Sequence, residues 1–182
     1  AYTLRLILDQ IDSVNFPRSG WSGGARLFDS NPDLGADNPY TKWDADGVAV
    51  YSWRAHTFQF AAKAGGKIGE NSLPRYDQFQ WGGFLQQSGY ATGQLLGESL
   101  QYGRIMYYHQ IMRGTFMDGA YSGFSLEATE MGEPLVPGNS TDVLKSVGIF
   151  LGTDTPIGPA YLGYGLAEDG NEAFYFYLGK PY

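Results

Sequence analysis

Apolar and polar side chains alternate along most of this chain, and this period of two constrains the fold more than any other feature. Between Tyr2 and Leu8 every even-numbered position is apolar, and Phe58 and Phe60 alternate with the polar Thr57 and Gln59. Segments 124–128 and 174–178 repeat the pattern. Successive side chains of a strand point to opposite faces, so this period is typical of strands with unlike faces. We therefore predict an all-β protein.

Turn-forming stretches divide the alternating pattern into separate strands, among them 15–20, 154–159 and 168–171. The candidate strands lie near 2–12, 19–31, 42–53, 55–67, 96–111, 119–132, 143–153, 158–167 and 172–182. Bacterial single-chain barrels have an even number of strands, so one of these nine segments is miscounted or the barrel is longer. The sequence thus predicts one antiparallel β-barrel domain over 1–182, with about 8 strands in this chain.

The apolar face of these strands points either into a soluble barrel or outward to lipid. Charged residues make up only 17% of the chain, against roughly 25% in ordinary soluble domains. Aromatic side chains near the strand ends match the girdles of membrane proteins. These residues are Trp43, Trp53, Tyr107, Tyr108, Tyr161 and Tyr164. Both features favour a transmembrane barrel in the outer membrane. The soluble alternative, a ligand-binding barrel, requires Phe58, Phe60 and Leu126 to face inward.

Composition excludes several functions. The chain has no Cys, which removes disulfides, thiol nucleophiles and Cys-based zinc sites. Its formal charge of −7 argues against nucleic acid as a partner. No Gly-x-Ser-x-Gly nucleophile motif is present, and the two histidines, His56 and His109, lie far apart in sequence. We therefore expect no enzyme activity, no metal and no cofactor.

Three segments carry a family resemblance. They are 73–97, with Gln87-Ser88-Gly89-Tyr90 at its centre, 121–128, and 154–182. Together they resemble the C-terminal half of the bacterial surface-antigen barrel superfamily, which includes the BamA and TamA insertases and the two-partner secretion transporters. Among these barrels the chain is most similar to the translocator of patatin-like, type Vd autotransporters. Pro17 and Gly20 in the first turn also fit that pattern.

The resemblance implies an outer-membrane barrel of about sixteen strands that moves or inserts polypeptide. One long loop of the family folds back into the lumen and carries a Val-Arg-Gly-Tyr/Phe motif. Here Gly89 and Tyr90 match, but Ser88 replaces the Arg. The loop is then expected to be held by neutral hydrogen bonds, or less firmly. Alternation places Glu127 on the lumen face, and Arg104 on the neighbouring strand is its candidate counter-ion.

The last strand presents apolar side chains at alternate positions, and these resemble the signal that the outer-membrane assembly machinery reads. The residues are Phe174, Phe176, Leu178 and Tyr182. We therefore expect a non-enzymatic translocator or insertion barrel without its family's N-terminal domains, in contact with outer-membrane lipids and the assembly machinery. The alternative is a small 8-strand barrel, alone or as a homodimer, with a structural or lipid- or protein-binding role and no polypeptide transport.

Overall fold

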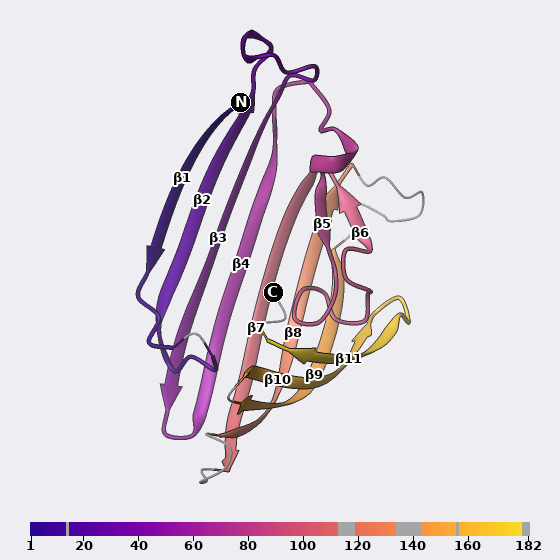
Figure 1. Ribbon diagram of the computed structural model, residues 1–182. Helices are drawn as coiled ribbons and strands as arrows, with labels where there is room; N and C mark the ends of the chain where they lie inside the picture. The colour runs from indigo at the N-terminus through magenta and orange to yellow at the C-terminus, as the bar shows by residue number, and fades with distance from the viewer. Residues whose placement is uncertain (14, 113–118, 134–142, 156, 180–182) are drawn as a thin grey trace.

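A computed structural model describes residues 1–13, 15–112, 119–133, 143–155 and 157–179. One antiparallel sheet of nine strands dominates it, in the order β1-β2-β3-β4-β7-β8-β9-β10-β11 (Figure 1). The strands are β1 Tyr2–Asp9, β2 Ser19–Ser30, β3 Tyr40–Trp53, β4 His56–Ile68, β7 Ser99–Met112, β8 Ala120–Gly132, β9 Leu144–Thr155, β10 Gly158–Ala167 and β11 Glu172–Leu178. Each strand pairs with its neighbours in the chain, except that β4 pairs with β7 across a long loop.

The loop between β4 and β7, residues 69–98, folds back against the sheet. It contains the 3₁₀ turn η2 (Arg75–Asp77) and a small hairpin of β5 (Phe79–Trp81) and β6 (Leu95–Gly97). A second 3₁₀ turn, η1 (Pro32–Leu34), lies between β2 and β3. This loop leaves the sheet at one end, which we call the "loop end". We call the opposite end the "turn end". No helix among the described residues is long and apolar enough to cross a membrane.

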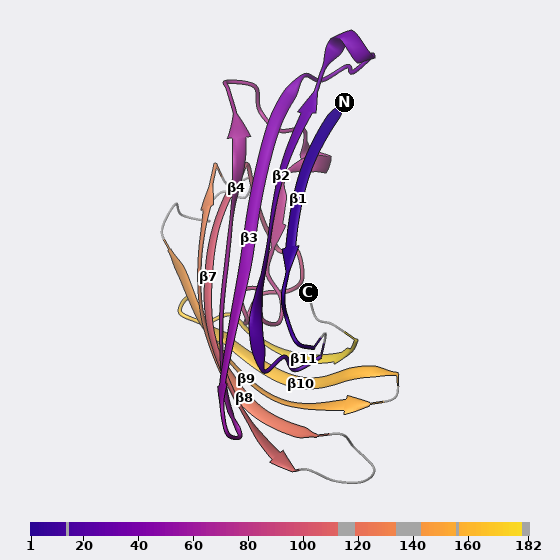
Figure 2. The same ribbon diagram turned by 90° about the vertical axis from the view of Figure 1, so that its left-hand side faces the viewer.

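The sheet is strongly twisted and curved. β1 and β11 run in clearly different directions in both views (Figures 1 and 2), as the right-handed twist of adjacent strands requires when it accumulates over many strands. We call the concave face, which the loop covers, the inner face. The convex face is the outer face.

The all-β, antiparallel prediction is confirmed, but the predicted number of about eight strands is wrong. The main sheet has nine strands, and the loop adds the two short strands β5 and β6. The small closed barrel is also not found among the described residues, because β1 and β11 are the edges of the sheet and do not pair with each other. The even-number rule applies to closed barrels, and this sheet is open.

Buried side chains gather on the inner face. One cluster, which includes Leu73, Trp81 and Leu100, lies toward the loop end. The other is mainly aromatic and includes Phe84, Tyr108 and Phe150. Phe58, Phe60 and Leu126, by contrast, are 40%, 49% and 52% exposed on the outer face. The soluble-barrel alternative required them to face inward, so its prediction fails.

The prediction of an aromatic girdle was correct in the exposure of some of its residues and wrong for others. Trp43 and Trp53 are exposed, as an interfacial position requires. Tyr108 and Tyr161 are buried on the inner face and belong to the aromatic cluster, so their assignment to the girdle is wrong. Alternation explains this correction, since Tyr107 and Tyr108 are adjacent and must face opposite sides.

Candidate functional site

The tip of loop 69–98 is the most deeply buried irregular segment of the described chain. Phe84, Leu85, Gln87 and Ser88 are at most 1% exposed. The tip turns sharply through residues with positive φ, including Leu85 at 60° and Gln87 at 89°. Such values are uncommon for residues other than glycine and cost free energy. The contacts that the tip makes with the sheet must therefore compensate for this strain.

Glu127 on β8 provides the central contact. Its Oε2 accepts hydrogen bonds from the backbone N–H groups of Gln87 and Ser88, with donor–acceptor distances of 2.7 and 2.6 Å. Its Oε1 accepts from the hydroxyls of Ser88 and Ser125 at 2.9 and 2.5 Å. The Ser146 hydroxyl also donates to Oε2, at 3.4 Å. Five neutral donors among the described residues thus surround one buried carboxylate, and successive backbone N–H groups in such a turn form an anion-binding nest.

Glycines on β9 and β10 let the loop tip approach the inner face of the sheet closely. We call the inner face of a group of strands its wall. A Cβ at Gly165 would lie 2.5 Å from the Gly89 nitrogen and 2.6 Å from the Ser88 Cβ. A Cβ at Gly163 would meet the Phe84 ring at 2.5 Å. Any side chain at these positions would push the tip away from Glu127. Part of the high glycine content therefore serves the contact between loop and wall.

A second set of contacts holds the end of the motif. The Tyr175 hydroxyl on β11 donates to the Tyr90 carbonyl oxygen and accepts from the Gly89 N–H, both at 2.8 Å. The Tyr90 hydroxyl donates to Asp169, in the turn between β10 and β11. Burial raises the pKa of the Asp169 carboxyl, but hydrogen bonds from Tyr90 and Asn171 outweigh that effect, so the pKa lies below its usual 3.8. The hydrogen bonds therefore favour the charged form of Asp169.

Arg104 lies directly opposite Glu127, since the two are register partners on β7 and β8. Both side chains are buried. The Arg104 guanidinium donates to the carbonyl oxygen of Leu85 at 2.7 Å and to the side-chain oxygen of Gln59 at 2.5 Å. Arg104 thus contacts the loop tip from the other side. The sequence prediction brought the right two residues together, and the ion pair between them stays a prediction.

Charged contacts also hold the base of the loop. The Lys42 ammonium on β3 lies 3.2 Å from Asp77 Oδ1 and 4.3 Å from the Phe79 ring centroid. Lys67 on β4 lies 2.6 Å from Glu98 Oε2. The loop is therefore attached at its tip by hydrogen bonds to Glu127 and from Arg104, and at its base by ion pairs.

The turn between β1 and β2 reaches across the inner face from the turn end. Phe16 in this turn is buried and stacks on Tyr121 of β8, with ring centroids 4.2 Å apart. Its ring also lies 5.1 Å from that of Tyr161 on β10. In addition, Asn15 donates to Asp154 at 3.1 Å. This turn therefore connects the β1 edge to β8, β9 and β10 near the turn end of the sheet.

The inner face of β1 to β3 differs from the loop-covered wall. It carries charges of both signs, with Arg26 Nε 3.0 Å from Asp44 Oδ2. A hollow of about 410 Å³ is lined there by residues that include Arg5, Asp9, Asp46 and Lys63. This part of the wall is polar and open.

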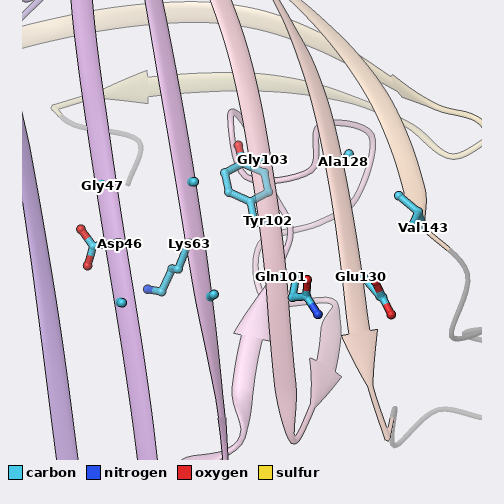
Figure 3. Close-up of a pocket in the computed structure, with 12 residues that line it drawn as sticks. Asp46, Gly47, Lys63, Gln101, Tyr102, Gly103, Ala128, Glu130 and Val143 are labelled. Carbon is cyan, nitrogen blue, oxygen red and sulfur yellow. The ribbon is translucent and has the colours of Figure 1, made fainter.

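The outer face of the central strands carries small residues beside its exposed apolar ones. Small residues of β3, β4, β7 and β8, including Gly47, Gly103 and Ala128, line a shallow hollow of about 500 Å³. Figure 3 shows Gln101 and Glu130 near each other on neighbouring strands beside it, and the two are register partners. Glu130 therefore lies on the outer face, three positions from Glu127 on the inner face.

The other predicted residues are also placed. Phe174, Phe176 and Leu178 project from the outer face of β11 and are 83%, 75% and 53% exposed. Tyr182 lies outside the described residues. The structure adds contacts that the sequence prediction missed, above all Tyr175, Asp169 and Phe16. For Tyr175, the alternating pattern predicted only that its side chain lies on the face opposite to Phe174 and Phe176.

The site offers no metal centre of the usual kind. No group of three or more His, Asp or Glu side chains within the described ranges is arranged to hold a metal ion.

In a comparison with protein-family models, residues 1–182 of the chain match the Omp85 superfamily domain. A search of curated protein sequences finds no match.

Proposed function

Because the chain belongs to the Omp85 superfamily of bacterial outer-membrane proteins, we propose that it is a translocator or insertion barrel in which loop 69–98 closes the lumen. The observation that carries the proposal is the nest around Glu127, which fixes the loop tip on the inner wall. The family's chemistry for this step uses an Arg of the loop. Here the carboxylate is provided by the wall and all the donors from the loop are neutral.

The geometry supports a loop that can leave and return. The loop tip carries no charge that must be desolvated when it returns, since Gln87 and Ser88 contribute backbone N–H groups and a hydroxyl. When the tip leaves, Glu127 faces a water-filled lumen, and Arg104 remains opposite it. A charge with a counter-ion beside it is less costly to expose or bury than an isolated one. Both positions of the loop are thus chemically satisfied.

A disulfide tests the role of the loop. A Cβ at Gly148 would lie 3.4 Å from the Ser88 Cβ, close to the spacing of about 3.5–4.5 Å in disulfides. The chain has no native Cys, so Ser88→Cys with Gly148→Cys forms a unique tether. We expect the oxidised protein to show lower ion conductance in planar bilayers, and reduction to restore it. The single variants and an outer-face tether, Ala45→Cys with Ala64→Cys, are the controls.

Equal conductance of the oxidised and reduced double variant would contradict the closing role. Membrane insertion is tested separately. A folded outer-membrane barrel requires detergent and changes its mobility on a denaturing gel after heating. Solubility without detergent, or unchanged mobility, would contradict the membrane assignment itself.

The partners also stay proposals. The apolar outer face fits lipid, and Phe174, Phe176 and Leu178 fit a signal for the assembly machinery because they are exposed on an edge strand. A second copy of the chain that pairs with the free edges is the alternative arrangement. Cross-linking in native membranes distinguishes the two, since a homodimer gives a product of twice the mass.

A further inference from the structure

We propose that His56 and His109 form a two-imidazole binding site for a divalent transition metal of the zinc, copper or nickel class. The two residues are separated widely in the sequence, but they are register partners on β4 and β7. Their ring centroids lie 4.7 Å apart, with an angle of 41° between the ring planes. Phe58, two positions after His56, is exposed on the outer face, so alternation places both imidazoles on that face, near the turn end.

His56 is oriented by a hydrogen bond. Its Nδ1 lies 2.7 Å from the Tyr107 hydroxyl, and the Trp53 ring stacks beside it at 6.5 Å. Metal-binding histidines almost always use one ring nitrogen for such a bond, which fixes the ring and leaves the other nitrogen for the metal. With the proton on Nδ1 donated to Tyr107, Nε2 of His56 has its lone pair available.

His109 has an unsatisfied nitrogen. Its Nδ1 is buried and has no hydrogen-bond partner among the described residues. A buried polar atom without a partner costs free energy, and no hydrogen bond at this nitrogen holds the ring in place. A metal ion held beside His56 would give this nitrogen the partner that it lacks.

Ligand chemistry selects the class of metal. Neutral imidazole suits zinc, copper and nickel, whereas calcium and magnesium prefer oxygen ligands. Two imidazoles leave the remaining positions to water, so the site is open. The Arg54 guanidinium lies 5.2 Å from the Trp53 ring centroid, and this nearby positive charge opposes a dication. We therefore expect moderate affinity, and a metal that joins β4 to β7 at the turn end.

The composition of the chain makes the test clean. It contains two histidines and no cysteine, so in tag-free protein no other imidazole or thiol contributes. Zinc chloride is titrated into the full chain in detergent micelles by calorimetry. We expect one zinc per chain, and His56→Gln or His109→Gln should each weaken binding by more than about tenfold. Tyr107→Phe, which keeps both imidazoles, should weaken it by about tenfold.

Tyr51→Phe is the matched control, because Tyr51 is another exposed tyrosine of the outer face, and its affinity should equal that of the parent. The heat-dependent gel shift verifies that each variant is folded. Absence of zinc binding would overturn the proposal. So would two equal, independent sites per chain, or a His variant that binds as tightly as the parent.

Discussion

The two sides of the sheet are built from the same alternating pattern but have different inner faces. The wall of β7 to β11 is covered by loop 69–98, and its inner side chains are mostly aromatic or hydroxyl-bearing and buried. The wall of β1 to β3 carries charged side chains beside an open hollow. On edge strand β1 even the inner-face side chains are exposed.

This difference shows that alternation determines the face of the sheet to which a side chain points, but not whether that side chain is buried. An inward-facing side chain is buried only where another segment covers it. On β8 the loop provides that cover, and Glu127 becomes 4% exposed. On β2 no described segment covers Arg26 in this way, and the Arg26 side chain in its ion pair with Asp44 is 44% exposed. Interactions on the covered wall should therefore contribute much more to stability than those on the open wall.

Glu127→Ala should have the largest effect. It leaves the donors of Gln87, Ser88 and Ser125 without their charged acceptor, and hydrogen bonds to charged groups contribute about 1.5–3 kcal/mol each. We expect the free energy of unfolding in lipid vesicles to fall by about 3–6 kcal/mol. Glu130→Ala, on the outer face of the same strand, should change it by less than about 1 kcal/mol. Equal losses for the two variants would refute the difference between the faces.

Phe16→Ala should come next. It removes a buried ring that packs on Tyr121 and Tyr161 and so disconnects the β1 edge from the covered wall. Truncation of a buried Phe costs about 3–5 kcal/mol, measured by the same denaturant titration. Phe60→Ala removes an outer-face ring of the same size and leaves no internal cavity. A Phe16 variant no less stable than the Phe60 variant would show that the turn does not connect the two sides.

Gly165→Ala tests the close approach of the loop. The new methyl would overlap the Gly89 nitrogen and the Ser88 Cβ, and overpacking costs about 1–3 kcal/mol. We expect faster protease cleavage within the loop as well as lower stability. Gly103→Ala on β7 is the matched control, since a Cβ there would have no neighbour within 4 Å. If the cleavage rate is unchanged in Gly165→Ala, the loop tip does not approach β10 as closely as the structure shows.

Arg26→Gln should have a smaller effect. The Arg26–Asp44 pair lies on the open wall, where exposed ion pairs contribute about 0.2–1 kcal/mol and are screened by salt. We expect a change in the free energy of unfolding within this range, which disappears at high ionic strength. A loss as large as that of Glu127→Ala would show that this wall is also covered in the membrane.

The smallest effect concerns pH. Because the folded pKa of Asp169 lies below 3.8, its contribution is fully present above that value and is lost as the pH falls through the folded pKa. Parent protein should thus lose slightly more stability in acid than Asp169→Asn, in parallel denaturant titrations at neutral and acidic pH. Identical losses of stability in the two proteins would show that the Asp169 carboxylate does not stabilise the fold through its hydrogen bond with Tyr90.

Some residues of the contact between loop and sheet were predictable from the sequence. The parity of Glu127 follows from its neighbours on β8, and the loop motif at 88–90 follows from the resemblance. Tyr175 and Phe16 could not be predicted as contacts of the same site, since they lie far from the loop in sequence. The pairing of His56 with His109 was missed for the same reason, as it depends on β4 meeting β7 across a long loop.

By itself, the sequence determined that the chain forms strands with one apolar face, because a period of two leaves no other regular structure with one apolar side. The structure decided that this apolar face is the outer one, since Phe58, Phe60 and Leu126 are exposed there. Tertiary structure alone decided the nine-strand order of the sheet, the open edges, and which inward residues are buried. It also decided that the neutral donors of the loop tip gather on the Glu127 carboxylate. Register and loop packing bring together residues that are distant in the chain, and no local pattern encodes those distances.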